Sequence, residues 1–161
     1  MGHSRPMVAV IFMMGFLVFG TVVWAGERFT DNGDGTVTDH LLGVMWAKSS
    51  NEGDINWKES TQWVRFTFPQ TIPTAYDNWR LPTLEELKSL YVKDDTYTGY
   101  ETDCGQNVWI VPVIRLTCGW VWSSEKRSIT ARVYNFNRGY HYTDRMVHKR
   151  AYRALPVRNL E

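Results

Sequence analysis

Cationic and aromatic side chains alternate over the last part of the chain, residues 125–161. This segment contains nine Lys and Arg residues against three acids, a net charge of +6. Five aromatic side chains lie between the charges: Tyr134, Phe136, Tyr140, Tyr142 and Tyr152. Long-range attraction and flat stacking faces together suit an anionic polymer. The segment therefore predicts a surface that contacts such a polymer.

A sulfated or carboxylated glycan needs cationic donors spaced along a surface, and Arg suits it best because its planar fork can hold two oxygens. Period-two alternation along a strand places four side chains on one face: Arg132, Tyr134, Phe136 and Arg138. The alternative is that the two aromatic residues belong to the core and the Arg residues to its rim. The predicted ligand-binding residues are Arg127, Arg132, Tyr134, Arg138, Tyr140, Arg145, Lys149, Arg150 and Arg153.

The chain between residue 26 and this basic segment is acidic. Residues 26–124 hold eight bases and fourteen acids, so their net charge of −6 balances the basic segment. Such polarity indicates either intramolecular pairing of the two parts or a molecule with two oppositely charged faces. Nucleic acid would suit the same cations. We do not expect it as a partner, because the chain is predicted to be exported and its mature part has no net charge.

The prediction of export rests on the N-terminal segment, residues 1–25. Arg5 precedes an uncharged apolar run from Met7 to Val23, and small residues then stand before a cut at Gly26, the layout of a secretory signal peptide. The alternative is an uncleaved anchor, since about 17 apolar residues approach a minimal membrane span. We expect a periplasmic or extracellular protein whose single domain, residues 26–161, has no membrane span.

The chain has two cysteines, Cys104 and Cys118. In an oxidising compartment a lone pair usually forms a disulfide. A redox or metal pair is disfavoured, because the spacing is not C-x-x-C and no histidine is close in sequence. The bond would pin the second half of a long irregular segment, residues 93–117.

The pattern of apolar residues predicts an α+β fold. Helices are expected over residues 56–66 and 83–91, the second with a capping box of Thr83 and Glu86. Strands are expected on both sides of a turn at residues 31–35, and also at 44–47, 119–124, 130–137 and 152–158. Pro156 places the last of these at an edge or a bulge. The expected architecture is two helices packed on a small antiparallel sheet, with the long loop pinned by the disulfide.

Two groups of acidic residues raise the question of calcium. The turn at 31–35 is not an EF-hand loop, because the position that should carry the closing carboxylate is Leu41. A second candidate cage lies in the long segment: Asp94, Asp95, Glu101, Asp103 and Asn107. Acids close together on a loop are usually solvated, so we predict no metal site and no cofactor.

The sequence gives little support to catalysis. The three histidines after residue 26, His40, His141 and His148, form no H-x-x-x-H or H-E-x-x-H motif, and no G-x-S-x-G occurs. Acid pairs such as Asp94 and Asp95 would suit a glycosidase in principle. We predict no catalytic residues. Among the tryptophans, Trp109 in the long segment is the first candidate for an exposed face that stacks on a sugar.

Several motifs occur in an order that resembles one family. They are RFTDNGDGTVTD at 28–39, GVMW at 43–46, NWRLPT at 78–83 with EEL at 85–87, WSS at 122–124 and PVR at 156–158. Together they resemble the C-terminal domain family of the collagen-like bacterial adhesin Lcl, over residues 27–158. The resemblance implies a C-type-lectin-like fold, and for the adhesin it implies binding of sulfated glycosaminoglycans and cell attachment. This chain contains no collagen-like repeats, so the adhesin's trimerisation is not implied.

Two functional hypotheses follow. The first is a secreted, non-catalytic module that binds anionic glycans or other cell-surface polymers, with a role in adhesion. The second is a structural or protein-interaction domain without a sugar ligand, in which the acidic part of one copy meets the basic segment of another copy or of a partner protein. Salt-sensitive self-association without glycan affinity would favour the second.

Overall fold

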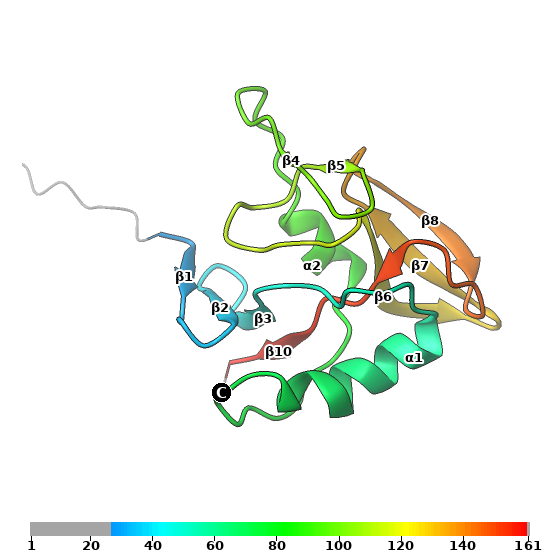
Figure 1. The fold of residues 1–161 in the computed structure, drawn as a ribbon, viewed down its shortest axis with the longest axis horizontal. Coiled ribbons are helices and arrows are strands. Elements are labelled where there is room, and N and C mark those ends of the chain that lie inside the picture. Colours follow the sequence, from blue (N-terminus) through cyan, green and yellow to red (C-terminus); the bar gives the residue numbers. More distant parts are fainter. Residues whose placement is uncertain (1–26, 161) are drawn as a thin grey trace, which may run out of the picture.

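Two four-stranded β-sheets organise residues 27–160, the part of the chain that the computed structural model describes (Figure 1). The predicted signal peptide, residues 1–25, lies outside the described residues. Strands outnumber helices, which confirms a mixed α+β class. The expectation of one small antiparallel sheet is wrong, because the strands divide between two sheets and a two-stranded ribbon.

The first sheet joins the two ends of the described chain. Its strands are β1 (Phe29–Asp31), β2 (Thr36–Asp39), β3 (Val44–Ala47) and β10 (Val157–Asn159), in the order β1-β2-β3-β10. All pairings are antiparallel, with Val157 opposite Trp46. The predicted turn at 31–35 connects β1 and β2, and Gly33 and Gly35 both have positive φ, which glycine adopts without steric cost.

The second sheet carries most of the basic segment. Its strands are β6 (Trp120–Arg127), β7 (Thr130–Asn135), β8 (Tyr140–Arg145) and β9 (Tyr152–Arg153), in the order β8-β7-β6-β9. β9 runs parallel to β6, whereas the other pairs are antiparallel. The single last strand expected at 152–158 is therefore two strands in different sheets. Pro156, which has no N–H to donate, lies where the chain crosses between them.

Both predicted helices are present. α1 (Trp57–Gln62) begins at a capping box of Asn56 and Glu59, and it continues as the π-helical turn η1 (Trp63–Thr67) and the 3₁₀ turn η2 (Phe68–Gln70). α2 (Leu84–Ser89) begins at the expected capping box of Thr83 and Glu86. α2 packs on β6 and β7 through buried leucines. No helix of residues 27–160 has the length and apolarity to cross a membrane.

A dense aromatic core lies between these elements. Trp46, Trp122 and Phe136 are completely buried, and the Trp122 indole donates to the Ile55 carbonyl at 3.0 Å. Trp79 is buried as expected. Trp109 is half-buried and its indole N–H donates to the Tyr97 carbonyl at 3.2 Å, so it is not the exposed stacking face that was expected.

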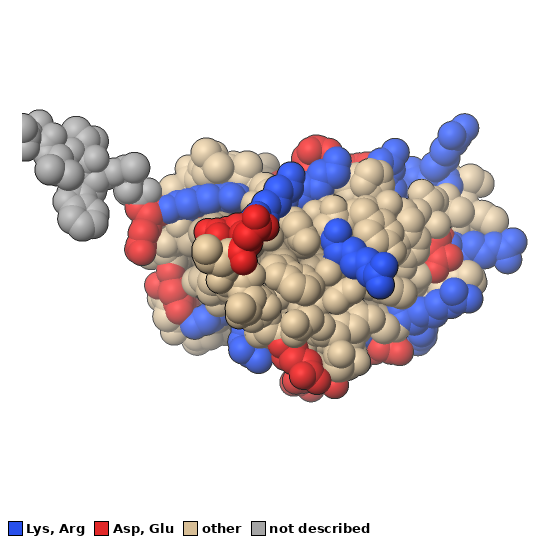
Figure 2. Space-filling model, turned by 90° about the horizontal axis from the view of Figure 1, so that it is seen from above, with Lys and Arg blue, Asp and Glu red and all other residues tan. Residues whose placement is uncertain are grey.

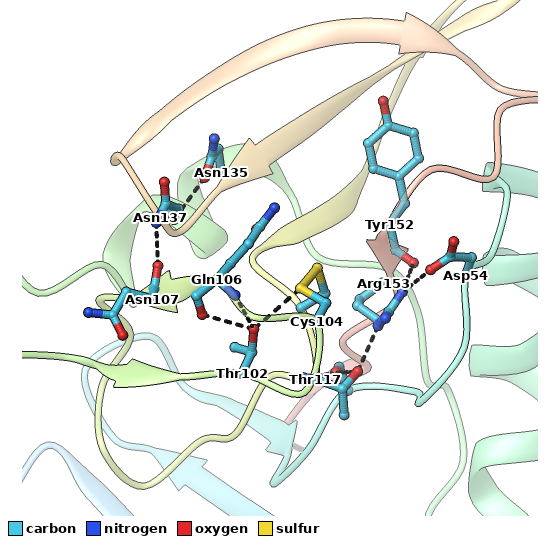
Figure 3. Close-up of a disulfide and its surroundings, with 12 residues drawn as sticks. Asp54, Thr102, Cys104, Gln106, Asn107, Thr117, Asn135, Asn137, Tyr152 and Arg153 are labelled. Atoms are coloured by element: carbon cyan, nitrogen blue, oxygen red, sulfur yellow. Dashed lines mark hydrogen bonds and ion pairs between the residues drawn. A yellow bond between two sulfur atoms is a disulfide. The ribbon is translucent and has the colours of Figure 1, made fainter.

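The predicted disulfide joins Cys104 to Cys118 (Figure 3). Cys104 lies in the connection between two short antiparallel strands, β4 (Tyr100–Glu101) and β5 (Asn107–Val108). The Thr102 hydroxyl donates to the Gln106 carbonyl at 2.9 Å, and the Asn137 amide donates to the Asn107 carbonyl at 2.6 Å. The loop is thus fixed both by the covalent bond and by contact with the β7–β8 turn.

Candidate anion-binding surface

A β-bulge in β6 shapes the surface where most of the predicted cations meet. Trp122 lies opposite Val133, but Lys126 lies opposite Ala131, so the register shifts between them. A bulge bends its strand and redirects the side chains beyond it. Here it precedes Lys126 and Arg127.

Both helices hold the bulged residues in place. The Trp57 indole, at the start of α1, donates to the Ser123 carbonyl at 2.9 Å. The Ser124 N–H donates to the Pro82 carbonyl at 2.7 Å. The Leu84 N–H, in the first turn of α2, donates to the Glu125 carboxylate at 3.0 Å. The bulge is therefore a rigid base for the residues that follow it.

A hollow of about 590 Å³ lies beyond the bulge, and we call it the basic hollow. Its lining is Glu125, Lys126, Arg127, Thr130, Ala131, Arg132 and Thr143. The Lys126 ammonium lies 5.2 Å from the centroid of the Trp57 ring. The Arg132 guanidinium lies 3.5 Å from the Glu125 carboxylate, which also accepts the hydrogen bond from the Leu84 N–H of α2. Within residues 27–160, Arg127 forms no ion pair, so its guanidinium is available to an external anion.

Further cations surround the basic hollow. Arg145 lies next to it, because its strand position is opposite Thr130. Residues 146–151 then bring Lys149 and Arg150 to the same end, with Lys149 2.6 Å from Glu59 of α1. Figure 2 shows Lys and Arg gathered, with a few acids, at the right-hand end of the molecule, where the β6–β7 hairpin ends in Figure 1. We call this set the basic end: Lys126, Arg127, Arg132, Arg145, Lys149 and Arg150.

A polar chain beneath the surface anchors residues 146–151. The Tyr152 hydroxyl donates to the Asp144 carboxylate, Tyr142 donates to Tyr152 at 3.0 Å, and His148 contacts the same carboxylate at 2.7 Å. Burial alone would raise the pKa of Asp144, but the hydrogen bonds from Tyr152, the Arg145 N–H and His148 lower it. Burial raises the pKa of Tyr142 to about 12. Asp144 is thus an acceptor whose carboxylate oxygens are engaged by Tyr152 and His148.

Two of the predicted binding residues lie far from the basic end. Tyr140 begins β8 opposite Asn135, and Arg138 is in the turn between β7 and β8. The five steps from Thr130 to Asn135 span about 17 Å of extended strand. The structure therefore brings most of the predicted cations together but leaves Arg138 and Tyr140, both exposed, at the opposite end of the hairpin.

Tyr134 is a core residue, as the alternative interpretation held. It is 2 % exposed and packs edge-on against Tyr91, just after α2, and against Phe136. Burial, with a smaller effect of Tyr91, raises its pKa to about 12. Arg132 is not buried in this way. It lies near the other end of α2, where the Glu125 carboxylate contacts both Arg132 and the Leu84 N–H. A ligand cannot reach Tyr134 in this arrangement.

Arg153 is also buried, so its prediction as a ligand-binding residue is not supported by its position (Figure 3). Its guanidinium donates to Asp54 at 2.8 Å, to the Thr117 hydroxyl at 2.6 Å and to the Tyr152 carbonyl at 2.9 Å. The hydrogen bond from Arg153 lowers the pKa of Asp54. This pair and the Lys149–Glu59 pair show that the acidic and basic parts of the chain do pair within one molecule.

The other candidate sites have ordinary structural roles. Asp94 accepts from the Thr96 N–H and hydroxyl, and Glu101 and Asp103 are exposed. Among residues 27–160, no three His, Cys, Asp or Glu side chains are placed to hold a metal ion. His40 contacts Thr30, and His141 lies 3.4 Å from Arg132.

Sequence reasoning missed Lys126, Thr130 and Thr143 as part of the surface. A signal for them was available. The strands expected at 119–124 and 130–137 leave only residues 125–129 between them, and a connection this short commonly joins the two strands of a hairpin. A hairpin there would have placed Lys126 and Arg127 beside Thr130 and its neighbours.

The family model described as the Lcl C-terminal domain matches residues 35–158. The match includes both helices, the disulfide and the second sheet, and it begins after β1 of the first sheet. No curated protein and no solved structure matches the chain.

Proposed function

The chain belongs to the Lcl C-terminal domain family, and on that premise we propose that it is an exported, non-catalytic module that binds anionic glycans, sulfated ones above all, at its basic end. The proposal includes a C-type-lectin-like fold, which the pairing of β10 with β3 near the two ends of the described chain supports. It also includes cleavage of residues 1–25, for which N-terminal sequencing of the exported protein should give Gly26.

One observation carries the binding proposal. The basic hollow is lined by three cations and Glu125, beside a bulge that contacts both helices, and Arg127 has no ion-pair partner among residues 27–160. A sulfate needs several donors directed at one point, and a guanidinium supplies two in a plane. The threonine hydroxyls of the lining add neutral donors for sugar hydroxyls.

The arrangement also suits a polymer better than a small anion. Arg145, Lys149 and Arg150 extend the positive surface beyond the basic hollow. A chain with repeated charges gains from each cation it meets, and the attraction decreases as salt is added. The ligand is held by cations, so binding should not require calcium.

Chromatography on heparin and on uncharged dextran tests the proposal, with residues 26–161 in oxidised form, at low and at physiological salt. We expect heparin-selective retention that weakens with salt and is unchanged by a calcium chelator. Arg127→Glu should elute at clearly lower salt than the wild type. Arg138→Glu is the matched control, because it makes the same change of charge at the far end of the hairpin.

Equal effects of the two substitutions would show that only overall charge matters and would remove the basic hollow from the proposal. Absence of heparin binding, together with salt-sensitive self-association in sedimentation, would favour an interaction domain without a sugar ligand. Pairing between the acidic and basic parts of two copies would then replace the pairing seen within one molecule.

A further inference from the structure

We propose that the apex of the β6–β7 hairpin docks onto anionic lipid bilayers, with Ile129 and Val147 inserting among the headgroups and the surrounding cations contacting the phosphates. We call these two residues the apolar apex. This inference goes beyond glycan binding, because it concerns a second partner and a separate pair of side chains.

The two apolar residues come from neighbouring connections. Arg127 pairs with Thr130, which leaves Ser128 and Ile129 as the whole of the hairpin turn. Ile129 is 61 % exposed and Val147 is 75 % exposed. The Met146 N–H donates to the Ile129 carbonyl at 3.0 Å, so the residue that follows Met146 is held close to the turn. Two exposed aliphatic residues thus lie on neighbouring backbone segments at the end of the sheet.

The residues of the turn are unusual for its geometry. Ser128 has φ +54°, a conformation that two-residue hairpin turns normally give to Gly or Asn. Folding gains little from Ile129 there, since most of its surface remains in water. Exposed aliphatic residues are common on protein surfaces, so the inference depends on the charges that surround this pair.

The charge around the apolar apex defines the partner. Lys126 and Arg127 precede the turn on β6, Arg145 ends β8 opposite Thr130, and Lys149 and Arg150 follow Val147. Three acids lie nearby: Glu125 faces Arg132, Glu59 is paired with Lys149, and Asp144 contacts Tyr152 and His148, so five cations stand around the apolar apex against these three acids. Basic residues next to an anionic bilayer are attracted to it within about one Debye length of roughly 10 Å.

A bilayer suits this combination better than a polysaccharide. Branched aliphatic side chains offer no flat face for a sugar ring, but they gain free energy when they leave water for the interfacial region of a membrane. Neither residue of the apolar apex belongs to the lining of the basic hollow. Arg127 borders both, so the two surfaces are adjacent and chemically distinct.

Vesicle flotation tests the inference. The core and both sheets lie within residues 27–160, so the chain from Gly26 retains the whole described fold. It should bind vesicles that contain phosphatidylglycerol and should not bind vesicles of phosphatidylcholine alone. The double substitution Ile129→Ser/Val147→Ser should weaken binding by roughly tenfold or more, by the transfer free energy of two partly buried side chains. Phe66→Ser is the matched control, because Phe66 is 71 % exposed on η1.

A second readout separates insertion from simple attraction. Ile129→Cys, labelled with an environment-sensitive dye, should show a blue shift on phosphatidylglycerol vesicles, and Phe66→Cys labelled in the same way should not. Heparin retention of the Ile129→Ser/Val147→Ser protein should be unchanged, which distinguishes this surface from the basic hollow. Unweakened vesicle binding by the double variant, or an equal loss of heparin and vesicle binding, would overturn the inference.

Discussion

Arginines beside the first sheet and at the end of the β6–β7 hairpin are used in opposite ways. Arg28, just before β1, contacts Asp39 at 2.7 Å, and Arg80 contacts Glu86 at 2.7 Å. At the end of the second sheet, Arg127 and Arg145 form no ion pair with any residue in 27–160. One group of arginines therefore holds the ends of the domain together, and the other presents donors to solvent. Arginine content alone does not distinguish the two groups, but the partner of each guanidinium does.

The paired group is tied to backbone as well as to carboxylates. Arg28 also donates to the Ser89 carbonyl at the end of α2, at 2.9 Å. Glu86 accepts from the Thr83 N–H and from Arg80, so one carboxylate completes a helix cap and an ion pair. Burial would raise the pKa of Glu86, yet these contacts lower it. Such arginines cannot leave their partners for a ligand without loosening the fold.

Arg28→Ala should have the largest effect on stability. Asp39 is completely buried, and loss of Arg28 leaves its charge without a counterion, which costs about 3 kcal/mol of unfolding free energy. Urea denaturation followed by tryptophan fluorescence measures it, with Arg127→Ala as the control. A loss below about 1 kcal/mol would show that the backbone N–H groups of residues 41 and 42 suffice for Asp39.

Arg153→Ala should cost somewhat less, about 2 kcal/mol. The substitution leaves the Tyr152 carbonyl and the Thr117 hydroxyl without their donor, but Asp54 is half-exposed and can be solvated. Heparin retention of the folded variant should match that of the wild type. Weakened retention without loss of stability would instead place Arg153 among the binding residues, as its sequence context had suggested.

The sequence predicted local structure well wherever short-range chemistry decides it. The capping box at Thr83, the glycine turn at 31–35 and the disulfide all depend on neighbouring residues or on a single pair of residue types. It failed where distant elements decide. Nothing near Tyr134 indicates that Tyr91 covers it, and nothing near Arg153 indicates Asp54, ninety-nine residues away. The sequence therefore predicted binding residues at two positions, Tyr134 and Arg153, that are buried in the structure.

Residues 152–158 are divided between two sheets, and this too is decided by elements that are distant in the sequence. Alternation and composition indicate extended chain there, which is correct on both sides of Pro156. Pairing partners are set by the whole topology, since β9 pairs with β6 and β10 with β3. A local pattern contains no information on which sheet a strand joins.

Acidification should destabilise the paired region, by less than either substitution above. Burial alone would raise the pKa of Asp39 and of Glu86, but the paired arginine, together with backbone N–H groups, lowers it in each case. A lowered pKa contributes stability that is complete above the unfolded-state pKa and is lost as pH falls through the folded-state pKa. Urea midpoints should thus be level above about pH 5 and fall below about pH 4. In Arg28→Ala the urea midpoint should fall less steeply with pH. An unchanged pH dependence would contradict the assignment of the lowered Asp39 pKa to Arg28.

Single alanine substitutions at Arg127 and Arg145 should have the smallest effect on stability, within about 0.5 kcal/mol, because neither guanidinium has a partner to lose among residues 27–160. The same substitutions should lower the salt concentration at which the protein leaves heparin. Arg28→Ala should show the reverse, a large loss of stability with unchanged elution of the folded fraction. Two measurements on three proteins thus separate arginines that hold the fold from arginines that meet a ligand. A substantial loss of stability in Arg127→Ala would mean that the basic end is itself a structural element, and the contrast between paired and unpaired arginines would then no longer identify a binding surface.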